Sequence, residues 1–169
     1  MDLSRWRKWR YALAFVITAA VAALLWAVNE KFPSPITMIL FPVNGSPWEV
    51  GKLLFWPYLP GAVLLWRLSG AENRGSQCVL LLLMPLTVTA LRCILGDRVP
   101  VWVLFAAVLL GGLVLYHLFL RRRLWGGELV WYVLAILLGI AYLLFTALPP
   151  WGKLFLPPED VMTMGTIPF

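Results

Sequence analysis

Charge is scarce in this chain of 169 residues: Asp, Glu, Lys and Arg make up 13% of it, against about 25% in soluble domains. Hydrophobic residues make up 62%, which is more apolar surface than a water-soluble monomer of this size can cover. The composition excludes a soluble domain and predicts an all-α integral membrane protein. Since the length leaves room for about five spans of about 20 residues, we expect residues 1–169 to form one membrane domain.

Residues that bind metals are also scarce, because the chain has one histidine, His117, and two cysteines, Cys78 and Cys93. The cysteines fall in one predicted helix, about 22 Å apart along its axis, which is beyond disulfide reach. No group of residues has the spacing of a zinc, haem or iron–sulfur site, so we predict no metal and no cofactor. The lone histidine is predicted on the opposite face from most acids, which argues against a serine triad and against an enzyme.

What the chain does have is five apolar runs of helical length, at residues 11–28, 47–66, 77–95, 100–120 and 129–148. The first run follows a basic segment but exceeds the roughly 7–15 residues of a signal-peptide core, which favours an uncleaved anchor. We therefore predict a bundle of five transmembrane helices. Small residues four apart would let these helices approach closely. Such pairs are Ala19 with Ala23, Ala107 with Gly111, and Ala135 with Gly139.

Basic residues outside the five runs are distributed unequally between the two sides. Nine fall on one side: Arg5, Arg7, Lys8, Arg10, Arg67, Arg74, Arg121, Arg122 and Arg123. Three fall on the other: Lys31, Arg98 and Lys153. The positive-inside rule then predicts a cytoplasmic N-terminus and, after five crossings, an external C-terminus. The net charge of +6 is explained by these clusters beside the apolar runs, so we predict no nucleic-acid partner.

Two external segments are rich in proline. In the first, Pro33, Pro35 and Pro42 flank the apolar residues 36–41, a stretch too short to span a membrane. It is either a segment in the interface that dips into the bundle or a simple hydrophobic loop. The second is the tail from residue 149 onward, whose prolines prevent a continuous helix and which we expect to pack over the external mouth.

The start of the second span combines a helix cap with a charge pair. Ser46, Pro47 and Glu49 suit the N-cap, the first position and the third position of a helix. Lys52 follows Glu49 by three residues, so the two side chains can pair on one helix face. Structural and ligand-binding roles are both open for this pair.

The same stretch carries a longer pattern, made of Pro42, Val43, Asn44, Ser46, Trp48, Glu49, Lys52, Leu53, Leu54, Phe55 and Pro57. This pattern resembles the signature P-V-N-E-S-V-W-E-H-L-K-L-L-F-F-P of an uncharacterised family of small multi-pass bacterial membrane proteins. In the tail, Pro149, Pro150, Leu154, Phe155 and Pro158 resemble that family's H-P-P-x-x-P-L-F-x-D-P segment. The family's histidines correspond to Val50 and Leu148 here, and its aspartate to Pro157. The resemblance therefore implies the fold, the topology and a bacterial inner membrane, and no metal ligand.

Prolines inside two spans mark a candidate site. Pro57 and Pro60 in the second span and Pro85 in the third fall near the middle of the bilayer. Each removes a helical hydrogen bond, which frees the carbonyls of Leu53, Trp56 and Leu81. Broken helices at this depth are typical of transporter binding sites, although kinks also serve packing alone.

Arg92 is a charge near the external end of the third span, and charged residues inside a membrane are candidates for function. Its side chain either extends to the outer headgroups, pairs with Asp97 or Glu49, or binds a ligand. We predict that Glu49, Lys52 and Arg92 converge at the outer ends of the second and third spans. Together with Trp56, Pro57 and Pro85 they form the predicted ligand-binding set.

These features lead to three functional hypotheses. The first is a protein that binds and transports a small molecule or ion, such as an anion, in a cavity beside the proline-containing spans. The second is a structural or accessory subunit of a larger membrane complex, for which five anchored helices suffice. The third is a lipid-modifying enzyme, which lacks an identifiable catalytic set. The expected partners are membrane lipids, a small ligand, and further copies of the chain or other subunits.

Overall fold

The computed structural model describes residues 3–32, 34–42, 45–69, 74–120, 127–148, 150, 152 and 154–155. Within this part of the chain the structure is helical and contains no strand. The helices are α1 (Leu3–Lys31), α2 (Pro35–Leu40), α3 (Pro47–Ser69), α4 (Arg74–Leu95), the 3₁₀ turn η2 (Gly96–Arg98), α5 (Val101–Leu115), the π-helical turn η3 (Tyr116–Leu120) and α6 (Glu128–Ala147).

The five predicted spans coincide with the five long helices. The run at 11–28 lies within α1, and the runs at 47–66 and 77–95 lie within α3 and α4. The run at 100–120 is α5 followed by η3, and the run at 129–148 differs from α6 by one residue at each end. The prediction of an all-α fold is confirmed.

Four of these helices are long and apolar enough to cross a membrane: Trp9–Lys31, Gly75–Arg98, Val101–Leu120 and Glu128–Ala147. The chain is therefore a multi-pass integral membrane protein. The remaining long helix, α3, has 23 residues, contains Glu49, Lys52 and Arg67, and is not among these four. That α3 also crosses the membrane stays a prediction.

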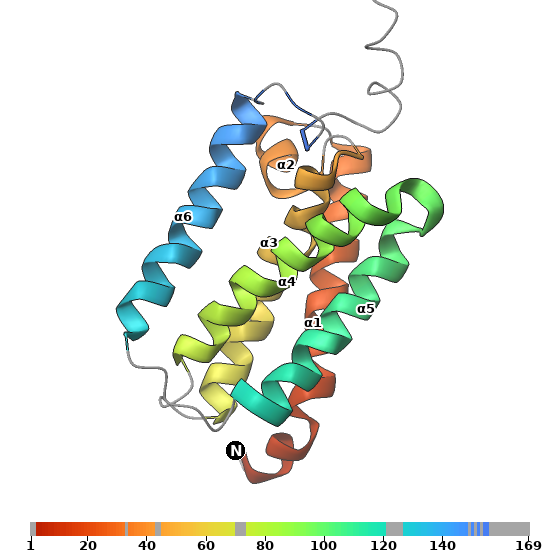
Figure 1. The fold of residues 1–169 in the computed structure, drawn as a ribbon. Coiled ribbons are helices and arrows are strands. Elements are labelled where there is room, and N and C mark those ends of the chain that lie inside the picture. Colours follow the sequence, from red (N-terminus) through yellow and green to blue (C-terminus); the bar gives the residue numbers. More distant parts are fainter. Residues whose placement is uncertain are drawn as a thin grey trace, which may run out of the picture.

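Two helices, α3 and α4, form the middle of the bundle (Figure 1). Helix α3 packs most extensively against α1 and α4, and α4 also contacts α5 and α6. At one end lie the start of α1, the end of α3 and the start of α6, and at the other lie α2 and the end of α6. We call the first the inner end and the second the outer end, following the predicted orientation.

The contact between α1 and α3 depends on small residues. On α1, Ala14, Thr18 and Ala22 are fully buried and four residues apart. Ala14 and Thr18 face Gly61 of α3, where an added Cβ would come within 3.2 Å of the Ala14 carbonyl oxygen. Close approach of the two backbones at small residues is typical of helix packing in membranes.

The pairs of small residues predicted from the sequence are not the residues through which α1 packs on α3. Ala23 is exposed, as are Ala107 and Gly111 on α5, so the first two pairs do not mediate close packing among the described helices. Ala135 and Gly139 on α6 are buried, and Gly139 lies against Phe55 of α3. Spacing alone therefore identified one of the three pairs correctly, because it does not reveal which face a helix turns inward.

The outer end is covered by two short segments. Residues 35–40 form helix α2 rather than a simple loop, and Ser34 caps it through a reciprocal hydrogen-bonded pair with Thr37. The tail residues Leu154 and Phe155 contact the start of α3. The rest of the tail after residue 155 lies outside the described residues.

The α1–α3 interface can be tested with Gly61→Val, which we expect to lower the free energy of unfolding by about 1–3 kcal/mol. Its Cβ would approach the Thr18 hydroxyl at 2.6 Å as well as the α1 backbone. Gly111→Val is the control, because no atom lies within 4 Å of the Cβ that it would add. Thermal unfolding in detergent measures both, and an equal midpoint for the two variants would contradict this interface.

The orientation of the bundle stays a prediction that cysteine labelling can test. We expect Arg98→Cys to react with a membrane-impermeant maleimide in intact cells and Arg67→Cys to react only after the cells are opened. Both positions are exposed, at opposite ends of the bundle. The background would carry Cys78→Ser and Cys93→Ser, since these are the native thiols. Labelling in the reverse order would invert the predicted topology.

Candidate functional site

A buried ion pair lies at the outer end of α3. The Lys52 ammonium is 2.6 Å from the Glu49 carboxylate, with Lys52 fully buried and Glu49 5% exposed. The helix starts here because the Ser46 hydroxyl accepts a hydrogen bond from the Glu49 N–H at 3.3 Å. The predicted cap and the predicted charge pair are both present. Burial makes this pair different from a solvated surface pair, because neither charge can be left without a partner.

Lys52 uses its three N–H donors to join three helices. Besides Glu49, it donates to the Met38 carbonyl of α2 at 3.3 Å and to the Thr146 hydroxyl of α6. Thr146 in turn donates to the Tyr142 carbonyl at 2.6 Å and lies 3.5 Å from the second Glu49 oxygen. The ammonium is thus satisfied inside the protein, and it fastens the outer ends of α2, α3 and α6 together.

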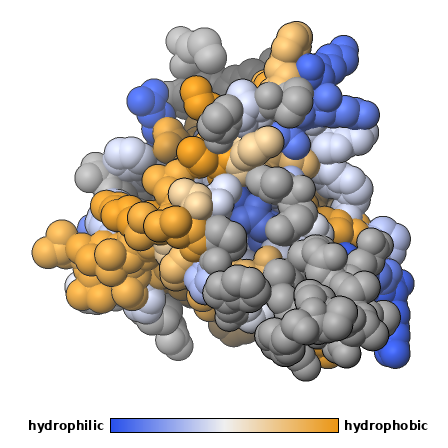
Figure 2. Space-filling model, turned by 90° about the horizontal axis from the view of Figure 1, so that it is seen from above, coloured by the Kyte–Doolittle hydropathy of each residue, from blue (hydrophilic) through white to orange (hydrophobic). Residues whose placement is uncertain are grey.

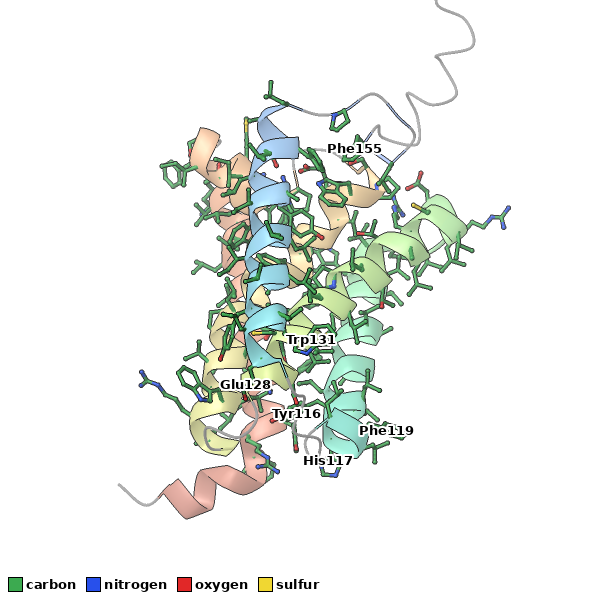
Figure 3. The ribbon with its side chains drawn as sticks, turned by 60° about the vertical axis from the view of Figure 1, so that its left-hand side comes forward. Tyr116, His117, Phe119, Glu128, Trp131 and Phe155 are labelled. Carbon is green, nitrogen blue, oxygen red and sulfur yellow. The ribbon has the colours of Figure 1, made fainter. Side chains whose placement is uncertain are left out.

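An aromatic cluster covers this ion pair. Trp48 stacks against Tyr142 and Phe145 of α6 and against Phe155 of the tail, with ring centroids 4.8, 5.4 and 5.5 Å away. Its backbone N–H donates to the Leu154 carbonyl at 3.0 Å. Figure 3 shows Phe155 at the outer end of the bundle, above the other labelled side chains. The cluster separates the ion pair from the outer surface.

Further hydroxyl groups lie close to the ion pair, where α3, α4 and α6 meet. Those of Tyr142 and Thr89 lie side by side and both face the backbone of Gly51. A Cβ at Gly51 would come within 2.8 Å of the Thr89 oxygen. The absence of a side chain at Gly51 is what lets these polar groups reach the middle of the bundle. Viewed from the outer end, hydrophilic residues are visible in the middle of the bundle (Figure 2).

Arg92 pairs with Asp97 in the turn that follows its own helix. Its guanidinium donates to the Asp97 carboxylate, to the Gly96 carbonyl at 2.7 Å and to the Val99 carbonyl at 3.5 Å. The 3₁₀ turn after α4 places these acceptors beside the arginine. Of the two pairings open from the sequence, the structure contains the one with Asp97. Glu49 and Lys52 are in contact as predicted, and the convergence of Arg92 with them stays a prediction.

Below the ion pair, an apolar cleft separates α3 from α6. It consists of two adjoining hollows of about 400 and 220 Å³, which share Leu59, Cys78, Leu81 and Tyr132. The larger is also lined by Phe55, Trp56, Ala135, Ile136, Gly139, Ile140 and Leu143, and the smaller by Ala62, Val63, Trp66 and Gln77. The two hollows extend from about one turn below Lys52 toward the inner end, with α4 as their floor.

This cleft contains part of the predicted ligand-binding set. Trp56 lines it, and so does Leu81, and the prolines free the carbonyls of both residues. Pro57 and Pro85 are buried within α3 and α4, which remain helical through them. The sequence therefore located a cavity beside the proline-containing helices. It missed Tyr132 and Gly139, because nothing in the sequence indicated that α6 would form the facing wall.

Two buried donors at the walls of the cleft have no partner among the described residues: the indole N–H of Trp56 and the side-chain amide nitrogen of Gln77. The amide oxygen of Gln77 is engaged, since it accepts a hydrogen bond from the Tyr58 hydroxyl at 2.8 Å. A buried donor without an acceptor costs free energy unless water or a ligand supplies one. Both nitrogen atoms are enclosed, on residues that line the cleft together with the polar side chains of Tyr132 and Trp66.

The ion pair predicts a large penalty for removing one charge. Lys52→Met leaves the Glu49 carboxylate buried without its counter-ion, and we expect a loss of about 3–5 kcal/mol in the free energy of unfolding. The double variant Glu49→Gln, Lys52→Met should recover most of this loss, because no charge is then buried. Lys31→Met, at an exposed position, is the control. Equal thermal midpoints for Lys52→Met and Lys31→Met would show that the pair does not hold the helices together.

Comparisons with known proteins identify no relative: no family model, no curated protein and no solved structure matches this chain. The resemblance of the stretch from Pro42 to Pro57 to a family of bacterial membrane proteins therefore stays a prediction.

Proposed function

We propose that this membrane protein binds and transports a small hydrophobic molecule that carries at least one hydrogen-bond acceptor. The observation that supports this most directly is the cleft between α3, α4 and α6. Its larger hollow, about 400 Å³, lies within the 300–1,000 Å³ typical of small-molecule sites. Apolar walls with a few polar groups are the usual composition of such sites. An oxygen atom of the ligand would satisfy the Gln77 or Trp56 donor.

A neutral or weakly polar ligand is favoured over an ion. Both charges near the cleft already neutralise each other, and all three donors of Lys52 have acceptors within the protein. An ion in the cleft would therefore lie among apolar side chains without a counter-charge, at a cost of several kcal/mol. The hypothesis of a small hydrophobic ligand avoids this cost.

The ion pair also suggests how the cleft would open to the outer side. Helix α6 is fastened to α3 at its outer end through Thr146 and Lys52, and the two helices separate below that point around the cleft. Loss of these contacts would allow the outer ends to separate as well. In this proposal the ion pair is the outer gate of a transport path, and α3 with its prolines is the element that bends.

Binding can be tested by filling the cleft. Ala135 is buried in its wall, and we expect Ala135→Trp to weaken binding of a pyrene-labelled fatty alcohol at least tenfold, measured by fluorescence titration of the protein in detergent. Ala107→Trp is the matched control, because Ala107 is exposed on α5 and lines neither hollow. Equal affinities of the two variants for the alcohol would contradict binding in the cleft.

The same purified protein also distinguishes this proposal from an accessory subunit. A subunit of a larger complex would copurify with other proteins in fixed proportion and would bind the alcohol no better than a control membrane protein. Gln77→Leu adds a test of the polar contact, since it should weaken binding of the fatty alcohol but not of the corresponding pyrene-labelled alkane. Equal effects on both probes would remove Gln77 from the site.

A further inference from the structure

The side-chain amide of Gln77 has one end bound by the protein and one end free. Gln77 lies near the start of α4, is 4% exposed and lines the smaller hollow of the cleft. Its oxygen accepts a hydrogen bond from the Tyr58 hydroxyl of α3 at 2.8 Å, whereas its nitrogen has no partner among the described residues. An amide has an acceptor at one end and two donors at the other, so its orientation decides which of them is left for a ligand.

Tyr58 determines this orientation. Its side chain is fully buried, and Gln77 is the acceptor that its hydroxyl reaches within the described part of the chain. The hydroxyl of Tyr116, a nearby buried tyrosine at the inner end (Figure 3), forms no hydrogen bond with the described residues and so does not take the place of Gln77. If the amide were turned over, its nitrogen would donate to the Tyr58 oxygen and the Tyr58 proton would lose its acceptor. Because a buried donor without an acceptor costs free energy, the observed orientation is favoured.

A second free donor lies in the larger hollow of the cleft. Among the buried side chains that line the cleft in the described structure, the nitrogen and oxygen atoms without a partner are those of Gln77 and Trp56. An indole nitrogen donates a hydrogen bond and cannot accept one. With the amide held by Tyr58, both atoms are therefore donors.

We propose that Tyr58, by holding the Gln77 amide, makes the cleft selective for ligands whose polar group accepts hydrogen bonds, such as a ketone or an ester. This inference rests on the proposed function and specifies the class of ligand. A carbonyl oxygen at Gln77 or Trp56 supplies the acceptor that each donor lacks. A polar group that can only donate, such as a pyrrole N–H, would meet these donors and remain unpaired. Tyr58 lines neither hollow, so it is a positioning residue that acts through Gln77.

A purely structural role for the Tyr58–Gln77 hydrogen bond explains less. A bond that only fastens α3 to α4 needs the amide oxygen, and it does not explain why the amide nitrogen is enclosed beside a cavity without an acceptor. A ligand that supplies an acceptor removes that cost. The two roles also differ in their consequences. Loss of a structural bond would change the affinity of every ligand alike, whereas loss of a positioning residue changes the preference among ligands.

This preference can be measured with three pyrene-labelled probes of equal chain length: an alkane, a methyl ketone and an alkyl pyrrole. Fluorescence titration of the purified protein in detergent gives their affinities, and ratios compared between protein variants cancel the partition of each probe into detergent. We expect Gln77→Leu to weaken ketone binding about fivefold relative to the alkane, which corresponds to one net hydrogen bond. We expect Tyr58→Phe to release the amide, and so to raise the affinity for the pyrrole about fivefold relative to the ketone.

Tyr116→Phe is the matched control, because Tyr116 is as fully buried as Tyr58, and its hydroxyl has no partner in the described structure and lines neither hollow. It should leave the ketone-to-pyrrole ratio unchanged. Infrared spectroscopy provides a second measurement that does not need Tyr58→Phe to fold. The carbonyl stretching frequency of a ¹³C-labelled ketone should be lower in the unchanged protein than in Gln77→Leu, because a donated hydrogen bond weakens the carbonyl bond.

The outcomes separate this inference from the proposed function. If Ala135→Trp weakens binding of all three probes but Tyr58→Phe shifts the ketone-to-pyrrole ratio no more than Tyr116→Phe does, the cleft binds ligands and Tyr58 does not select them. Equal carbonyl frequencies in the unchanged protein and in Gln77→Leu would likewise overturn the inference alone. If no probe binds, or if Ala135→Trp affects none of them, the cleft is not the binding site and both proposals fail.

Discussion

Enclosing the Lys52 ammonium is the constraint on which the arrangement of the outer half depends. A charge exposed to hydrocarbon is costly, so each of its donors needs an acceptor within the protein. Glu49 supplies one acceptor from the same helix, and the others come from Met38 of α2 and Thr146 of α6. Because these acceptors lie on separate elements, α2 and α6 must both close on the start of α3. The helix that carries a charge pair in its first turns thereby becomes enclosed by its neighbours.

The same contact explains why a cleft exists at all. Helix α6 is held against α3 at its outer end, but lower down Gly139 meets Phe55 and the walls then part around Trp56 and Tyr132. Each helix also packs on α4, which keeps them in one bundle while a gap persists between them. The contact between Lys52 and Thr146 therefore holds the outer ends of the two helices together while the cavity lies below it. A ligand that changed the spacing of α3 and α6 would affect both features.

The sequence predicted the helices well because hydropathy depends on runs of neighbouring residues. It predicted the Ser46 cap and the Glu49–Lys52 contact for the same reason, since both involve residues three positions apart. It could not identify Thr146 as the partner of Lys52, because 94 residues separate them. The sequence left Asp97 and Glu49 open as partners of Arg92, and the pairing with Asp97 is present because the turn after α4 places acceptors beside the arginine. A lone glutamine or threonine inside an apolar span can indicate from sequence where a buried polar site lies. Gln77, Thr89 and Thr146 are such residues, and all three lie at the candidate site.

The charges near the α3–α6 cleft influence which ligands it can bind. In the α3–α6 cleft the nearest charges cancel within one ion pair, so the remaining selectivity comes from two uncharged donors and the apolar walls. A neutral molecule that enters the cleft can form hydrogen bonds there, and it has no charge of its own that must leave water. Under the transport proposal, the cleft would therefore favour a neutral solute over an ion.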